Sequence, residues 1–178
     1  GSILFQPKPV LSKKRINIES TTVIFDVTPF EGLDTDVLYT TEIMTDFISD
    51  ILEILREERV SQVARILLKP KRRYKRKLHR KFAPSRLYMN HIYKLHLRKD
   101  LQLLEPETNL YDLVSIASLV IGIPYTSPVV LAKEMNIECI YYIPDSGRDW
   151  ILGNHYENIP VIQGKKELSD FVRKLRTT

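Results

Sequence analysis

The turn Tyr125-Thr126-Ser127, called here the hydroxyl turn, carries the residues of this chain best suited to binding an anion. An apolar run precedes it, and Pro128 and Val129 open a helix-like pattern after it. We expect Ser127 to cap this helix and Pro128 to take its first position, so that the amide of Val129 points back at the turn. Helix-start amides and hydroxyls bind phosphate oxygens, which makes the turn a candidate phosphate site. Ordinary capping by Ser127, without any ligand, is the alternative interpretation.

A basic segment, residues 69–81, is the second candidate element. It contains nine Lys or Arg and no acid, whereas the rest of the chain is slightly acidic and the net charge is +5. Lys69, Lys71 and Arg72 follow a strand-like run, so we expect them at the same carboxyl edge of a parallel sheet as the hydroxyl turn. Cations at that edge would neutralise the phosphates of a nucleotide. A solvated loop is the simpler interpretation of the residues beyond Arg72.

Four other side chains are weaker candidates. Glu134, two helical turns after the hydroxyl turn, is placed either to accept hydrogen bonds from a ribose or to be a solvated acid at a helix end. Asp145 and Ser146 follow another strand-like run, where they would contact the ribose or base of a nucleotide or form a plain turn. Asp26 is an acid among apolar neighbours, which indicates either a role in the site or a structural carboxylate.

Neither metal-ligand spacing nor a pairing of a nucleophile with a histidine can be read from the sequence. The four histidines are scattered, and the single Cys139 lies in an apolar strand pattern, which is typical of a reducing compartment. No apolar run approaches the roughly 18 residues of a membrane span. We therefore assign no catalytic residue and no metal ligand, and we expect a cytoplasmic protein.

Strand-like and helix-like patterns alternate along the chain, which predicts a Rossmann-like, doubly wound α/β fold with a parallel sheet of about six strands and helices on both faces. Residues 1–21 are predicted to be an extended lead-in or linker, and residues 22–178 the domain. In the helix expected over 41–57 the acid Asp50 is predicted to lie off the apolar face, and in that over 84–99 Leu87 is predicted to point inward. The expected strands are 22–27, 64–68, 101–104, 119–123, 138–143 and 160–162, and the other expected helices begin near 109, 128 and 167. No G-x-G-x-x-G or P-loop pattern occurs, so dinucleotide oxidoreductases and P-loop kinases are disfavoured.

Four stretches, residues 25–30, 67–72, 104–112 and 123–134, together resemble bacterial surface-polysaccharide biosynthesis proteins that carry a Pro-Phe-Thr-Ser motif. The likeness extends from about residue 22 to residue 175, and Tyr125 stands where the motif has Phe. Those proteins look like glycosyltransferases of the GT-B type, which have two Rossmann-like domains. The resemblance implies that this chain is the carboxyl-terminal domain, which binds the nucleotide-sugar donor.

The resemblance also implies which molecules the site would meet. Lys69-Pro70-Lys71 is similar to the His-Pro element that contacts the donor phosphate in transferases using CMP-linked acidic sugars, with Lys in place of His. The nucleotide sugar would be a substrate, with no cofactor and no metal, and the acceptor would be a glycan or a lipid-linked glycan of a capsule or lipopolysaccharide. The general base would come from an amino-terminal Rossmann-like domain absent from this chain, and the protein would work at the inner face of the cytoplasmic membrane.

Two functions of other classes compete with this interpretation. The basic segment, with Tyr74 available for stacking, also suits a module that binds nucleic acid or an anionic membrane surface. A sugar-nucleotide epimerase on a related fold is the other alternative, because one scaffold hosts many reactions.

Overall fold

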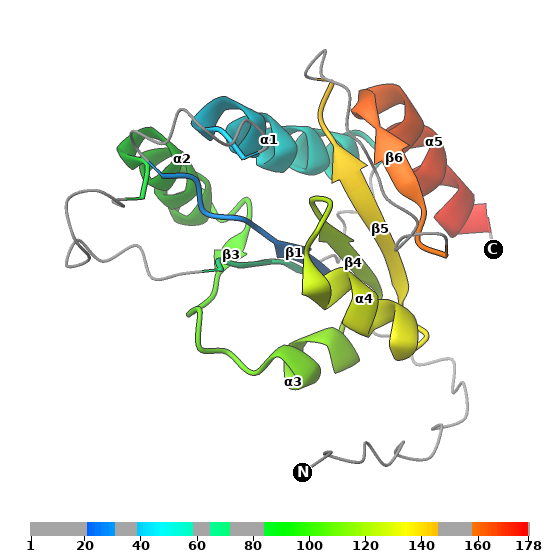
Figure 1. Ribbon diagram of the computed structural model, residues 1–178. Helices are drawn as coiled ribbons and strands as arrows, with labels where there is room; N and C mark the ends of the chain where they lie inside the picture. The colour runs from blue at the N-terminus through cyan, green and yellow to red at the C-terminus, as the bar shows by residue number, and fades with distance from the viewer. Residues whose placement is uncertain (1–20, 31–38, 59–64, 72–83, 146–157, 178) are drawn as a thin grey trace, which may run out of the picture.

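The computed structural model describes residues 21–30, 39–58, 65–71, 84–145 and 158–177 (Figure 1). Within these ranges a single parallel sheet is formed by six strands in the order β3-β2-β1-β4-β5-β6. The strands are β1 (Thr21–Phe25), β2 (Arg65–Lys69), β3 (Gln102–Leu103), β4 (Leu119–Gly122), β5 (Glu138–Ile143) and β6 (Val161–Gln163). This order reverses between β1 and β4, as in doubly wound nucleotide-binding folds.

Helices cover both faces of the sheet (Figure 1). One face carries α1 (Thr41–Glu57), α2 (Arg86–Leu97) and α5 (Gly164–Thr177), and the other carries α3 (Leu110–Ser115) and α4 (Ser127–Glu134). The predicted Rossmann-like α/β architecture is confirmed. Among the helices in the described ranges, none has the length and apolarity needed to cross a membrane.

The core consists of two apolar layers, one on each side of the sheet. Alternate residues of a strand point to opposite faces, so Ile24 and Ile121 pack under α1, whereas Val23 and Val120 pack under α3 and α4. Because both faces are covered, the strands are buried throughout, which explains why the sequence shows apolar runs and not an alternating pattern.

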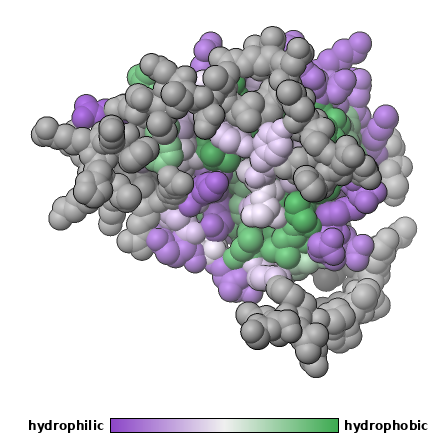
Figure 2. Space-filling model, in the orientation of Figure 1, coloured by the Kyte–Doolittle hydropathy of each residue, from purple (hydrophilic) through white to green (hydrophobic). Residues whose placement is uncertain are grey.

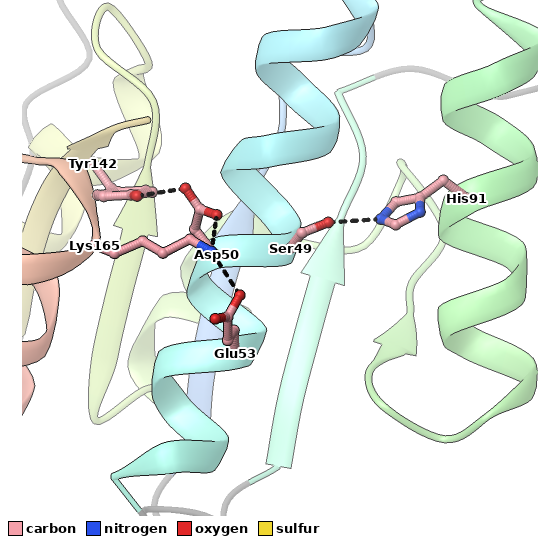
Figure 3. Close-up of polar contacts among 6 residues, drawn as sticks. All are labelled: Ser49, Asp50, Glu53, His91, Tyr142 and Lys165. Carbon is pink, nitrogen blue, oxygen red and sulfur yellow. Dashed lines mark hydrogen bonds and ion pairs between the residues drawn. The ribbon is translucent and has the colours of Figure 1, made fainter. Parts of the chain in front are cut away.

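Asp50 on α1 is buried, which corrects the sequence-based expectation that it lies off the apolar face. Its carboxylate accepts a hydrogen bond of 2.8 Å from the Tyr142 hydroxyl, and the Lys165 ammonium lies 3.3 Å from its other oxygen (Figure 3). Glu53, one turn along α1, holds the same ammonium at 2.7 Å. A buried acid is tolerated here because both of its oxygens have partners, and the cluster ties α1 to β5 and α5.

The prediction that Leu87 points inward is also wrong. The residues of α2 that are buried are Tyr88 and Ile92, while the Leu87 side chain is 75% exposed. The helix begins after Ser85, whose hydroxyl accepts a hydrogen bond from the Tyr88 amide, and this start sets the helix one position away from the expected orientation.

Candidate functional site

The candidate site lies where the strand order reverses, at the carboxyl ends of β1 and β4. Phe25 at the end of β1 pairs with Gly122 at the end of β4, so the two strands end side by side. The Tyr39 hydroxyl, just before α1, donates a hydrogen bond of 2.8 Å to the Pro124 carbonyl and holds the start of α1 against the loop after β4. Ligands of open α/β sheets bind in the crevice at this position.

The hydroxyl turn connects β4 to α4, and its geometry differs from the prediction. Thr126, not Ser127, is the N-cap residue, so Ser127 and Pro128 take the first and second helical positions. The Thr126 hydroxyl is buried and donates a hydrogen bond of 2.7 Å to the Ile123 carbonyl. Its proton is therefore not free for a phosphate oxygen, whereas the Ser127 side chain is exposed.

Within the described part of the chain, the first turn of α4 has no capping side chain. Thr126 makes no hydrogen bond to the helix amides, so Ser127 and Val129 contribute backbone N–H groups that no side-chain cap satisfies. Pro128 has no N–H to contribute. Two uncapped amides at the positive end of a helix dipole favour a bound anion.

Gly122 allows α4 to begin directly against the end of β4. A Cβ added there would lie 2.5 Å from Val129 Cγ2 and 2.6 Å from Thr126 Oγ1. Only glycine leaves room for these two side chains, so the first turn of α4 packs onto the strand without a spacer. Val129 itself is fully buried, and only its amide is placed to meet a ligand.

Tyr125 gives the turn its shape and an aromatic surface. Its φ of 67° lies in the left-handed region, which non-glycine residues rarely adopt and which clusters at binding sites. Its side chain is partly exposed, as is that of Val130 on α4. Figure 2 shows hydrophobic residues gathered over α3 and α4, so the hydroxyl turn borders an apolar surface.

Thr28, in the loop after β1, was not predicted as a site residue. Its side chain is 2% exposed, and its hydroxyl is a buried polar atom that has no hydrogen-bond partner among the residues that the structure describes. Such a group costs free energy unless something satisfies it, so the Thr28 hydroxyl is a candidate ligand contact. The two residues after it lead toward the start of α2, where the Ser85 amide donates a hydrogen bond of 2.8 Å to the Pro29 carbonyl and Phe30 pairs with Pro84. Threonine before proline is common in turns, and nothing in the sequence distinguishes this one.

Asp26, by contrast, is fully engaged. Its carboxylate accepts a hydrogen bond of 2.7 Å from the Lys71 amide and one of 2.8 Å from the Tyr88 hydroxyl. The residue thereby joins β1 to the loop after β2 and to α2. These contacts favour the structural interpretation over a direct role in the site.

Lys69 and Lys71 end β2 and follow it, at the same carboxyl edge as the hydroxyl turn, with β1 between. The Lys69 ammonium donates a hydrogen bond of 2.7 Å to the Pro106 carbonyl and is held toward the loop between β3 and α3. The Lys71 side chain is exposed, and its ammonium has no such anchor among the described residues. Arg72 and the rest of the basic segment lie outside the described residues.

The remaining candidates are scattered. Glu134 is the last residue of α4, at the opposite end of the helix from Ser127 and about 10 Å along its axis, so the structure does not bring it to the carboxyl edge. Asp145 is exposed two residues after β5, at the carboxyl edge, and Ser146 lies outside the described residues. Burial raises the pKa of the Cys139 thiol, which keeps it protonated and unreactive.

Histidine, cysteine and acidic side chains form no group of three or more that could hold a metal ion in the part of the chain that the structure describes. Apart from the Asp26 carboxylate, whose oxygens are bonded to the Lys71 amide and the Tyr88 hydroxyl, the polar groups considered at the carboxyl ends of β1, β2 and β4 are hydroxyls, backbone amides and lysine ammonium groups. This set suits an anion with several oxygens.

Comparisons with known proteins identify the family of the chain but not its site. Among curated proteins, no significant sequence match to the chain was found. The family model described as "Polysaccharide biosynthesis PFTS motif protein" matches residues 1–172, nearly the whole chain. The motif in that description corresponds to Pro124-Tyr125-Thr126-Ser127, the turn that begins α4. The chain belongs to the PFTS motif family of polysaccharide biosynthesis proteins.

Proposed function

We propose that this chain binds the phosphate of a nucleotide-sugar donor at the carboxyl edge between β1 and β4, as the donor-binding domain of a glycosyltransferase. The observation that carries the proposal is the uncapped start of α4 at the carboxyl end of β4, and the orphan Thr28 hydroxyl in the loop after β1 supports it. Family membership supports the setting, because a nucleotide sugar is the usual activated substrate from which polysaccharides are built.

Ser127 and Val129 are the proposed primary phosphate ligands. The Ser127 hydroxyl and the two backbone amides would donate to the phosphate oxygens, and the Thr28 hydroxyl would donate to the same group from the β1 side. Thr126, whose proton is committed to the Ile123 carbonyl, shapes the turn and does not bind. The sequence analysis assigned both Thr126 and Ser127 to phosphate binding, and the proposal keeps only the Ser127 hydroxyl as a phosphate ligand.

Lys71 supplies the positive charge in this proposal. Its side chain is exposed at the end of β2, from which it can reach across β1 toward a bound phosphate. Lys69 contributes less, because its ammonium is anchored to the Pro106 carbonyl. Tyr125 offers an aromatic face for the nucleobase, since stacking on an exposed ring tolerates several bases.

During transfer the sugar–phosphate bond breaks and negative charge grows on the leaving nucleotide. Fixed amides and a lysine at that phosphate stabilise the developing charge, which is the largest contribution a donor domain makes to the reaction. The acceptor hydroxyl needs a general base within about 3 Å, and we propose that a second domain supplies it. A CMP-linked sugar, a UDP-linked sugar and a GDP-linked sugar all carry the required phosphate.

Calorimetric titration of the chain with CMP, UDP and GDP tests this proposal. Ser127→Ala removes one ligand hydroxyl, and Ser115→Ala, at the end of α3, is the matched control on the same face. We expect one nucleotide to bind the wild type and the control equally, and Ser127→Ala to bind roughly tenfold more weakly, the loss of one charge-assisted hydrogen bond. The salt should be near 0.15 M, so that loose capture by the basic segment is screened. Equal binding by all three proteins would contradict the site.

A further inference from the structure

Tyr141, on β5, is fully buried and lies against the hydroxyl turn. Its hydroxyl donates a hydrogen bond of 2.9 Å to the carbonyl of Thr126, the residue that precedes α4. The bond joins residues that are 15 positions apart, so it depends on the fold and not on the local turn. The phenol therefore holds one particular peptide group of the candidate site.

The register of the sheet explains how Tyr141 reaches this carbonyl. Tyr141 pairs with Gly122 at the end of β4, and both residues face the layer of α3 and α4. A Cβ at Gly122 would lie 2.6 Å from Thr126 Oγ1. The turn therefore lies directly over the glycine, within reach of the phenol on the neighbouring strand.

Two other side-chain hydroxyls hold the same turn. Tyr39 donates to the Pro124 carbonyl at 2.8 Å, and the Thr126 hydroxyl donates to the Ile123 carbonyl at 2.7 Å. Tyr39 packs against the core layer under α1, whereas Tyr141 belongs to the layer under α3 and α4, so the turn is held from both faces of the sheet. A turn fixed at three carbonyls is expected to be rigid before any ligand binds.

The bond from Tyr141 also sets the direction of a backbone N–H. The Thr126 carbonyl and the Ser127 amide belong to one planar trans peptide group, in which C=O and N–H point in opposite directions. Because the phenol holds the carbonyl on the buried side, the Ser127 N–H is directed away from Tyr141, at the uncapped start of α4.

We propose that Tyr141 is a positioning residue that orients the Ser127 amide for the phosphate of the donor, an inference that rests on the proposed function. The Tyr141 hydroxyl does not itself touch the ligand, because it is buried and bonded to the Thr126 carbonyl. An amide that is already held in its bound direction binds more tightly, since binding does not have to order it. A purely structural tyrosine would stabilise the fold without affecting the Ser127 amide.

Tyr142→Phe is the matched control for Tyr141→Phe. Tyr142 is the next residue of β5 and is also fully buried, but its side chain faces the other layer and its hydroxyl donates to the Asp50 carboxylate at 2.8 Å (Figure 3). Each variant keeps the aromatic ring and loses one bonded hydroxyl, so both are expected to be less stable than the wild type. Only Tyr141→Phe releases the hydroxyl turn.

Two measurements on the wild type and both variants test the inference. Backbone nitrogen relaxation of the ligand-free chain gives the order parameter of the Ser127 amide. We expect this order parameter to be about 0.85 in the wild type and in Tyr142→Phe, and to fall to about 0.6 or below in Tyr141→Phe. In calorimetric titrations with CMP, UDP and GDP near 0.15 M salt, we expect Tyr141→Phe to bind roughly tenfold more weakly than Tyr142→Phe, because binding must then order the turn.

An equally rigid Ser127 amide in Tyr141→Phe would overturn the inference, whether or not a nucleotide binds. Equal nucleotide affinities of Tyr141→Phe and Tyr142→Phe would also overturn it, because Tyr141 would then only stabilise the fold. If the wild type bound none of the three nucleotides, the proposed function would fail, and the order parameters would still decide whether Tyr141 holds the amide.

Discussion

Replacing Thr28 by Val should stabilise the free protein and weaken ligand binding, so one substitution tests both consequences of the buried hydroxyl. The Thr28 hydroxyl is buried and unpartnered, so its desolvation costs about 1 to 3 kcal/mol that no protein contact repays. Valine has nearly the same shape and no hydroxyl, so the free protein should become more stable by about 2 kcal/mol. For a chain of this length that corresponds to a rise in Tm of roughly 4 to 8 °C. The same change removes one donor to a bound phosphate and should weaken nucleotide binding by roughly tenfold to a hundredfold.

Thermal unfolding followed by circular dichroism, together with nucleotide titration, measures both effects. The matched control is Thr126→Val, another buried threonine at the same edge, whose hydroxyl does have a partner, the Ile123 carbonyl at 2.7 Å. That variant should lose about 1 kcal/mol of stability, the opposite sign. A Thr28→Val protein that is less stable than the wild type would show that the hydroxyl is satisfied. Unchanged nucleotide affinity in the same protein would remove Thr28 from the site.

Three further predictions follow from contacts elsewhere in the fold. Gly122→Ala should destabilise the protein by about 1 to 3 kcal/mol in urea unfolding and weaken nucleotide binding, because the added Cβ would lie 2.5 Å from the buried Val129 side chain. If the variant were as stable as the wild type, α4 would not be packed so closely against β4. Asp50→Ala should lower the free energy of unfolding by about 1 to 3 kcal/mol, because it leaves the buried Tyr142 hydroxyl without its hydrogen-bond acceptor. In a Tyr142→Phe background the same substitution should cost much less, and an undiminished cost there would contradict the pairing. Burial, followed by the charges of nearby cations, lowers the pKa of His91 below its ordinary value of 6.5. The contribution of neutral His91 to folding stability is therefore complete above pH 6.5 and is lost as the pH falls through the pKa of the folded state. His91→Gln should make the urea midpoint less dependent on pH in this range, and an equally steep dependence in the variant would exclude His91 as its source.

Much of the fold was predictable from the sequence because the signals were local. The helix Thr41–Glu57 and the strand Glu138–Ile143 have the predicted bounds, since long periodic or uniformly apolar runs specify an element without help from distant residues. Asp50 and Leu87 could not be placed in this way. Asp50 is buried because Tyr142 and Lys165, both about a hundred residues away in sequence, satisfy its oxygens. Leu87 is exposed because the helix starts at the position that Ser85 sets.

The placement of the candidate site residues was predictable in outline and not in detail. The hydroxyl turn and Lys71 lie at one edge because parallel strands end together, which the alternation of elements already implied. Which hydroxyl is free depends on where α4 begins. The helix starts one residue earlier than expected, so Thr126 becomes the cap residue and Ser127 the exposed one. The orphan state of Thr28 is a property of packing and leaves no trace in the sequence.

Amide chemical shifts in a titration of the labelled chain with CMP, UDP and GDP test the central claim most directly. The account predicts that one nucleotide causes saturable shifts that are largest at the Ser127 and Val129 amides, with Thr28 also affected. The amides of α2 should remain unperturbed. Shifts that are absent at near-millimolar nucleotide, or that are confined to α2 and the basic segment, would contradict a phosphate site between β1 and β4.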